Sequence, residues 1–217
     1  LWLLKLEEGK SFDDVMALMA TMETDPQMPA WMVWYGGVTA GPGQTSAYTI
    51  DLAPGTYSLI SFGEDAEGVP DVMKGMEMTL TVTEAETAGA TPPAADLRTE
   101  LVDFSYVIEG QPAAGQQNLE VANTGMEPHE AVMLKLGDGV TVEDALDFLM
   151  AGEEAGGPPP FAFAGGIGPM DAGLTAWYEL DIPAGEYGLI CFIPSAANGG
   201  APHFMLGMVA QVTVTEQ

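Results

Sequence analysis

The segment Thr45–Phe62, TSAYTIDLAPGTYSLISF, has a counterpart in Thr175–Phe192, TAWYELDIPAGEYGLICF. In each segment two runs rich in β-forming residues flank a Pro/Gly turn, which is the pattern of a β-hairpin. A match in both pattern and residues between distant parts of one chain indicates an internal repeat of a β-rich unit.

The match continues on both sides of this segment. Upstream, Ser11–Val15 (SFDDV) aligns with Thr141–Ala145 (TVEDA), and each stretch begins with a hydroxyl residue followed by acids, which is typical of a helix N-terminus. Downstream, the strand-like Thr79–Glu84 (TLTVTE) aligns with Gln211–Glu216 (QVTVTE). Each copy is therefore predicted to be mostly β, with one short helix.

A segment with a Pro pair, AETAGATPPAA at residues 85–95, separates the two copies and has few large apolar residues. Such a composition is typical of a semi-extended linker. We expect a first domain at residues 1–84, a linker at 85–96 and a second domain at 97–217.

The first copy has no counterpart of residues 97–130, which hold two strand-like runs. Two explanations stay open. The chain is a fragment or processed form of a longer protein, since Leu1 is not a natural start residue and no secretory signal is visible. Alternatively, a strand from elsewhere completes the first sandwich by β-augmentation, which predicts self-association by strand complementation.

Charge restricts the classes of partner. The chain has 32 acidic and 5 basic residues, for a formal net charge of −27. Such a surface repels nucleic acid and anionic lipid, whereas it suits a secreted or halophilic protein in a salty medium. No apolar run approaches the roughly 20 residues of a membrane span, so no transmembrane segment is expected.

The chemistry-bearing residues gather in the second copy. The single Cys and both His of the chain fall there, at the ends of predicted strands. Cys191 ends one strand, eleven residues lead from it to His203, and four more lead to Met208. His129 begins an earlier strand. Each of these residues alone would be an ordinary core side chain, but together, in this order, they indicate a metal site.

This order resembles the cupredoxin (plastocyanin/azurin) family. Its copper is held by a His from one strand and by Cys, His and Met from the loop joining the last two strands. The His-x4-Met spacing from His203, with Gly207 before Met208, is similar to the plastocyanin ending, although the loop after Cys191 is longer than in small blue copper proteins. The resemblance covers residues 97–217 fully and 1–84 partially.

The resemblance implies an all-β fold of two tandem cupredoxin-like Greek-key β-sandwiches, the first without its N-terminal strands. It also implies one copper ion in the second domain, held by His129, Cys191, His203 and Met208. Two imidazoles and a thiolate with a weak axial thioether accommodate both Cu(I) and Cu(II).

The first copy lacks at least two of these ligands. Ser61 aligns with Cys191 and Asp71 with His203, while the counterpart of His129 would lie before Leu1. The first domain is therefore predicted to be copper-free.

Function follows as an expectation. We expect an extracytoplasmic copper protein, secreted, periplasmic or at the cell surface, that transfers electrons to a redox partner protein through a type 1 (blue) centre. Copper storage or delivery stays open. The alternative is a structural or assembly protein of the envelope or of an extracellular filament, with copper absent or structural. An enzyme is not expected, because two histidines leave none for a second copper centre.

Overall fold

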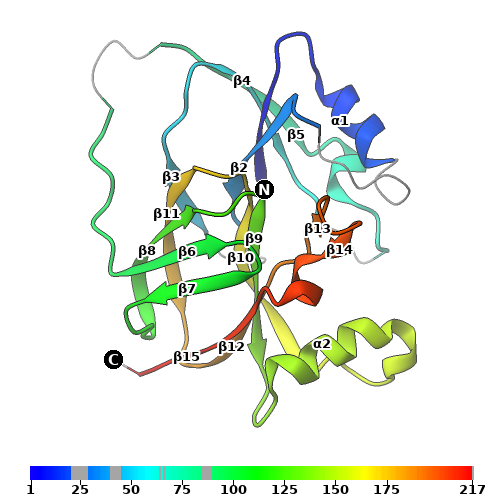
Figure 1. Ribbon diagram of the computed structural model, residues 1–217, viewed down its shortest axis with the longest axis vertical. Helices are drawn as coiled ribbons and strands as arrows, with labels where there is room; N and C mark the ends of the chain where they lie inside the picture. Colours follow the sequence, from blue (N-terminus) through cyan, green and yellow to red (C-terminus); the bar gives the residue numbers. More distant parts are fainter. Residues whose placement is uncertain (21–28, 40–44, 64, 66, 85–88, 217) are drawn as a thin grey trace.

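The computed structural model describes residues 1–20, 29–39, 45–63, 65, 67–84 and 89–216 (Figure 1). Residues 85–88 of the expected linker lie outside this part. Two packed β-sheets form the body of the molecule. The elements are β1 (Trp2–Leu6), α1 (Phe12–Met19), β2 (Met32–Gly37), β3 (Ala47–Ile50), β4 (Gly55–Ile60), η1 (Asp71–Lys74), β5 (Glu77–Val82), β6 (Leu97–Val102), β7 (Ser105–Glu109), β8 (Gly115–Asn123), β9 (His129–Leu136), α2 (Val142–Ala151), η2 (Gly152–Ala155), β10 (Phe161–Met170), β11 (Thr175–Ile182), β12 (Gly185–Ile190), β13 (Pro194–Ser195), β14 (Ala201–Pro202), η3 (His203–Leu206) and β15 (Val209–Val214).

The larger sheet has the order β15-β12-β9-β10-β2-β1-β4-β5. Its first four strands come from the C-terminal half of the chain and its last four from the N-terminal half. The halves join where β10 pairs with β2, with Met170 opposite Tyr35 and a further bridge between Val38 and Ile167. The sheet thus runs without a break from one half to the other.

The smaller sheet has the order β3-β11-β8-β6-β7, in which β6 and β8 are parallel. Among the described residues the N-terminal half contributes only β3, and this strand pairs with β11. At that pairing Tyr48 lies opposite Tyr178, and their rings stack with centroids 5.4 Å apart. Both sheets therefore connect the two halves, and the second half supplies most of the smaller one.

One short helix in each half covers the outer face of the larger sheet. On β1, Leu4 and Leu6 pack with Val15 of α1, whereas Leu3 lies in a cluster with Tyr57 on the opposite face. On β9 the same alternation brings one face against α2. Both helices lie on one side of the molecule in Figure 1. The predicted all-β sandwich with short helices is confirmed.

Both helices also begin where the sequence predicts. The Asp14 carboxylate accepts a hydrogen bond from the Ser11 backbone N–H at 2.9 Å, and Asp144 does the same for Thr141 at 2.9 Å. These carboxylates satisfy the N–H groups of Ser11 and Thr141, which have no partner inside the helix.

The prediction that residues 45–62 and 175–192 form β-hairpins is wrong. In the first segment β3 belongs to the smaller sheet and β4 to the larger one, and β11 and β12 are divided in the same way. The Pro/Gly turn therefore carries the chain from one sheet to the other. Alternating apolar residues identify each run as a strand but do not choose its partner, and the two-sheet core provides better partners than the neighbouring run.

A tyrosine side chain holds each of these two turns between the sheets in place. The Tyr57 hydroxyl donates to the Ala53 carbonyl at 2.7 Å, and the Tyr187 hydroxyl donates to the Pro183 carbonyl at 2.8 Å. Both tyrosines have buried rings, so each hydroxyl needs a partner, and the carbonyl four residues earlier supplies it. The two halves thus use the same local device.

Candidate metal centre

Three neighbouring strands of the larger sheet bring the four predicted ligands to one end of it. Cys191 directly follows β12, His129 is the first residue of β9, and Met208 directly precedes β15. Because β12 is antiparallel to both β9 and β15, its end lies beside their beginnings. His203 begins η3, in the loop that leads into β15.

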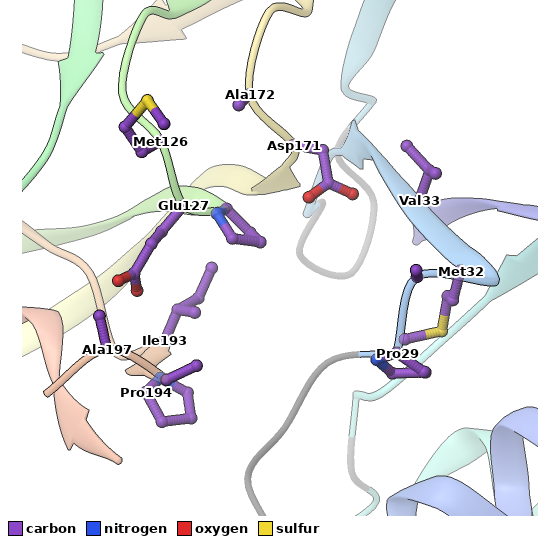
Figure 2. A pocket seen from close by; sticks show the side chains of 13 residues that line it. Pro29, Met32, Val33, Met126, Glu127, Asp171, Ala172, Ile193, Pro194 and Ala197 are labelled. Carbon is purple, nitrogen blue, oxygen red and sulfur yellow. The ribbon is translucent and has the colours of Figure 1, made fainter. Parts of the chain in front are cut away.

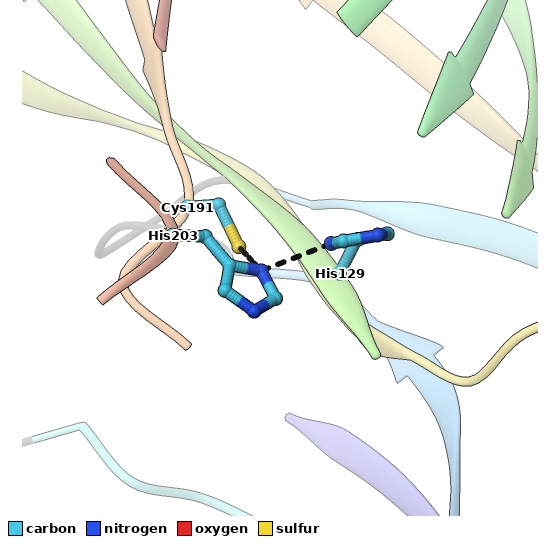
Figure 3. A group of neighbouring side chains, drawn as sticks. All are labelled: His129, Cys191 and His203. Carbon is cyan, nitrogen blue, oxygen red and sulfur yellow. Dashed lines mark hydrogen bonds between the residues drawn. The ribbon is translucent and has the colours of Figure 1, made fainter. Parts of the chain in front are cut away.

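The donor atoms of three of these residues converge. Nδ1 of His129 lies 3.0 Å from Nδ1 of His203, and Sγ of Cys191 lies 3.4 Å from the same His203 nitrogen. All three atoms lie within 4.8 Å of one another, and the three side chains are fully buried. Figure 3 shows the thiol and both rings pointing toward one another.

Met208 is held next to this group through its backbone. Its N–H donates to the His203 carbonyl at 3.0 Å, and its carbonyl accepts from the Cys191 N–H at 3.3 Å. Its side chain is fully buried in the same apolar cluster as Cys191. Its role as the axial ligand stays a prediction.

The donor set fits a thiophilic cation. Burial raises the pKa of the Cys191 thiol to about 12, so without a cation the sulfur keeps its proton at neutral pH. Burial also lowers the pKa of His129, which favours the neutral imidazole that ligates metals. Two imidazole nitrogens and one sulfur are the donors that copper and zinc accept in proteins.

Two carboxylates that the sequence analysis missed complete the site. The Nε2–H of His129 donates to Oδ1 of Asp103 at 3.0 Å, and the Nε2–H of His203 donates to Oε2 of Glu127 at 3.0 Å. With the proton held on Nε2, each ring presents the lone pair of Nδ1 to the centre. Glu127, two residues before His129, could have been suspected from its position. Asp103 carries no sequence signal.

Asp103 is held in place by the turn between β6 and β7. Burial acts to raise its pKa, but hydrogen bonds from the Met126 backbone N–H, at 2.8 Å, and from His129 outweigh this effect and lower it. Phe104, next in the turn, adopts a positive φ of 64° and sets its ring edge against His203, with centroids 5.1 Å apart. A positive φ is rare outside glycine and is found where surrounding contacts impose it.

Glu127 lines a groove between the two halves (Figure 2). Its second oxygen, Oε1, accepts a hydrogen bond from the Ser195 hydroxyl at 2.9 Å. The groove has a volume of about 530 Å³ and is lined by Pro29, Ala30, Met32, Val33, Met126, Glu127, Pro128, Asp171, Ala172, Ile193, Pro194, Ala196 and Ala197. His203 itself is fully buried, and Glu127 both lines the groove and contacts the His203 imidazole at 3.0 Å.

A third carboxyl group fixes the loop that carries the thiol. Glu130 is buried, and Oε1 accepts a hydrogen bond from the Phe192 N–H at 3.0 Å. Burial raises its pKa to about 7. This bond ties β9 to the residue after Cys191, and so fixes the distance between the thiol and His129.

The corresponding position of the first half is different. The Ser61 hydroxyl donates to Oδ2 of Asp71 at 3.1 Å, and Nζ of Lys74 lies 3.1 Å from Oδ1 of the same carboxylate. Asp71 and Lys74 form an ion pair, and the Ser61 hydroxyl hydrogen-bonds to the Asp71 carboxylate. These three side chains offer no thiolate or imidazole to a metal.

Comparison with known proteins gives partial likenesses. No family model matches the chain, and no curated protein matches it. Among solved structures, auracyanin B matches with a TM-score of 0.37 and 22% sequence identity, over 59% of this chain and 93% of that one. A multi-copper oxidase from Pediococcus acidilactici matches with a TM-score of 0.28 and 15% identity, over 61% of this chain and 28% of that one. The metal chemistry therefore has to be inferred from the donor set itself.

In the described residues, no helix is both long and apolar enough to cross a membrane.

Proposed function

We propose that this chain is a cupredoxin-type copper protein that transfers single electrons to and from a redox partner protein. His129, Cys191 and His203 would hold one copper ion, and Met208 would add a weak thioether donor. The observation that carries this proposal is the convergence of two Nδ1 atoms and one Sγ atom within 4.8 Å in a fully buried site. The bound ion supplies a one-electron couple between Cu(I) and Cu(II).

The residues around the donors support electron transfer by keeping them fixed. Strands β9, β12 and β15 hold the ligand backbones, and the Glu130 contact joins the two ligand-bearing segments. The apolar cluster around Cys191 and Met208 excludes water from the sulfur atoms. Ligands that are held in fixed positions move little when the charge of the metal changes by one unit, and a small reorganisation favours rapid electron transfer.

Metal analysis combined with a redox titration tests the proposal. The chain loaded with Cu(II) and freed of excess metal should hold one copper per molecule and should take up and release one electron reversibly. Zinc bound in place of copper, or a Cu(II) signal that does not return on reoxidation after the first reduction, would contradict it.

We further propose that the chain is a tandem repeat whose first copy has lost its metal. The matching tyrosine contacts of Tyr57 and Tyr187 support this, as does the placement of Tyr48 against its aligned counterpart Tyr178. Ser61 and Asp71, which bond to each other and to Lys74 at the corresponding position, offer no thiolate or imidazole, so we propose that the first copy is copper-free. We propose no catalysis, because both histidines of the chain belong to one centre.

Replacing Met208 with Leu tests the axial ligand. We expect Met208→Leu to retain copper and to raise the reduction potential, because a thioether that donates to Cu(II) is replaced by an apolar group. Voltammetry measures the shift. The matched control is Met76→Leu, at the aligned and half-exposed position of the first half, which should leave the potential unchanged. Equal potentials for Met208→Leu and the parent chain would remove Met208 from the ligand set.

An assembly role is the second candidate, and the smaller sheet is the observation that favours it. In the part of the chain that the structure describes, this sheet ends at β3, which comes from the first half. An edge strand can pair with a strand from another chain. Concentration-dependent sedimentation with no copper-dependent redox couple would favour this role, whereas a monomer with a reversible couple would favour electron transfer.

In either role we propose an extracytoplasmic location, which suits the excess of acidic residues.

A further inference from the structure

Each of the two imidazoles of the centre hydrogen-bonds to a carboxylate through its Nε2 atom. His129 reaches Asp103 and His203 reaches Glu127, each at 3.0 Å, and neither ring has any exposed surface. The carboxylates are at the border of the protein, with exposed side-chain fractions of 34% for Asp103 and 19% for Glu127. Each carboxylate therefore lies across an imidazole ring from the Nδ1 atom that converges with Cys191.

We propose that Asp103 and Glu127 bias this centre toward Cu(II), as positioning residues that act through the two histidines. This inference rests on the proposed function. Cu(II) carries one more positive charge than Cu(I), so fixed negative charges near the ion stabilise the oxidised form more. A carboxylate that accepts the Nε2–H of a ligating imidazole also makes Nδ1 a stronger donor, which again favours the more highly charged ion.

The two charges are held in place before a metal arrives. Oδ1 of Asp103 also accepts the Met126 N–H, and Oε1 of Glu127 accepts the Ser195 hydroxyl. Gly125 allows the close approach, because a Cβ there would lie 2.5 Å from Oδ1 of Asp103 and 2.6 Å from Nε2 of His129. Fixed charges of this kind require no reorganisation when the metal changes its oxidation state.

No cationic side chain offsets these charges in the part of the chain that the structure describes. The ion pairs of its lysines and arginine join Lys10 to Asp14, Lys74 to Asp65 and Asp71, and Arg98 to Glu120. In the described residues the ion pairs of the lysines and the arginine do not include Asp103 or Glu127, which contact the imidazoles of His129 and His203. Their negative charge is therefore available to the metal.

The expected consequence is a centre that holds Cu(II) tightly and gives up electrons readily once it is reduced. Relative to a version with neutral partners at the same places, it should have a lower reduction potential and a higher ratio of Cu(II) affinity to Cu(I) affinity. The protein would then act as the electron donor toward partners of higher potential.

Amide variants isolate the charge from the hydrogen bond. Asp103→Asn and Glu127→Gln retain an oxygen that accepts the Nε2–H but remove the negative charge. We expect each variant to raise the reduction potential and to lower the ratio of Cu(II) to Cu(I) affinity by about tenfold to a hundredfold. Glu186→Gln is the matched control, since it removes one charge from the far end of β12 and should change neither quantity.

The readouts are competition titrations of Cu(II) and Cu(I) with chelators and the potential from voltammetry. Nitrogen NMR of the metal-free chain should show protonated Nε2 in the parent and in both amide variants. If the ratio of Cu(II) to Cu(I) affinity changed no more in Asp103→Asn and Glu127→Gln than in Glu186→Gln, the inference would be overturned, while the copper function would stand. A parent chain that forms no thiolate–copper complex would instead overturn the proposed function. If Asp103→Asn does not fold, Glu127→Gln decides the question, because its carboxylate lies on a different loop.

Discussion

Cys191→Ser abolishes the intense visible absorption that Cu(II) should give with this chain. That absorption arises when an electron moves from the thiolate to the copper, and a serine hydroxyl, which keeps its proton, provides no such donor. We expect essentially complete loss of the visible band and a decrease of Cu(I) affinity by several orders of magnitude, because Cu(I) depends on soft sulfur ligands. Titration with Cu(II) and with a Cu(I) chelator measures both effects.

The matched control for this variant is Ser61→Ala, at the aligned position of the first half. The Ser61 hydroxyl donates to Asp71 in that half, so its loss should leave the absorption intact. Retention of the band in Cys191→Ser would show that the thiol is not a ligand.

Gly125→Val is expected to cause the second large effect. A Cβ at this position would lie 2.5 Å from Oδ1 of Asp103, 2.6 Å from Nε2 of His129 and 3.0 Å from the Asp103 backbone nitrogen. The side chain has to displace this pair, which costs about 1–3 kcal/mol of unfolding free energy. The displaced His129 should also weaken metal binding by roughly tenfold to a hundredfold.

Urea unfolding of the metal-free chain measures the loss of stability, and a copper titration measures the loss of affinity. Gly89→Val is the control, because a Cβ at Gly89 meets nothing within 4 Å. If Gly125→Val were as stable as the control and bound copper equally well, the contact between His129 and Asp103 would have no structural importance.

Local patterns predicted the elements of the fold well. The hydroxyl and acidic residues at Ser11 and Thr141 indicated both helix starts, and the two helices begin directly after them. The order of His129, Cys191 and His203 along the chain resembles that of cupredoxin ligands, and this resemblance predicted the convergence that the structure has. Antiparallel pairing places the end of β12 beside the starts of β9 and β15.

Contacts between sheets and between loops could not be read from the sequence. The segment at 45–62 looks like a hairpin, yet its strands separate into two sheets, since pairing partners depend on the whole core. Asp103 reaches His129 from a turn 26 positions earlier. One acid among 32 gives no signal of its own until the fold places it against a buried imidazole.

An electron paramagnetic resonance spectrum of the chain loaded with Cu(II), recorded together with its visible spectrum, is the most direct test of the copper centre. Two imidazoles and one thiolate bound to a single ion predict an intense visible band and an unusually small copper hyperfine splitting, because the unpaired electron is shared with sulfur. A colourless sample with the large splitting of copper bound by nitrogen and oxygen alone would contradict the account.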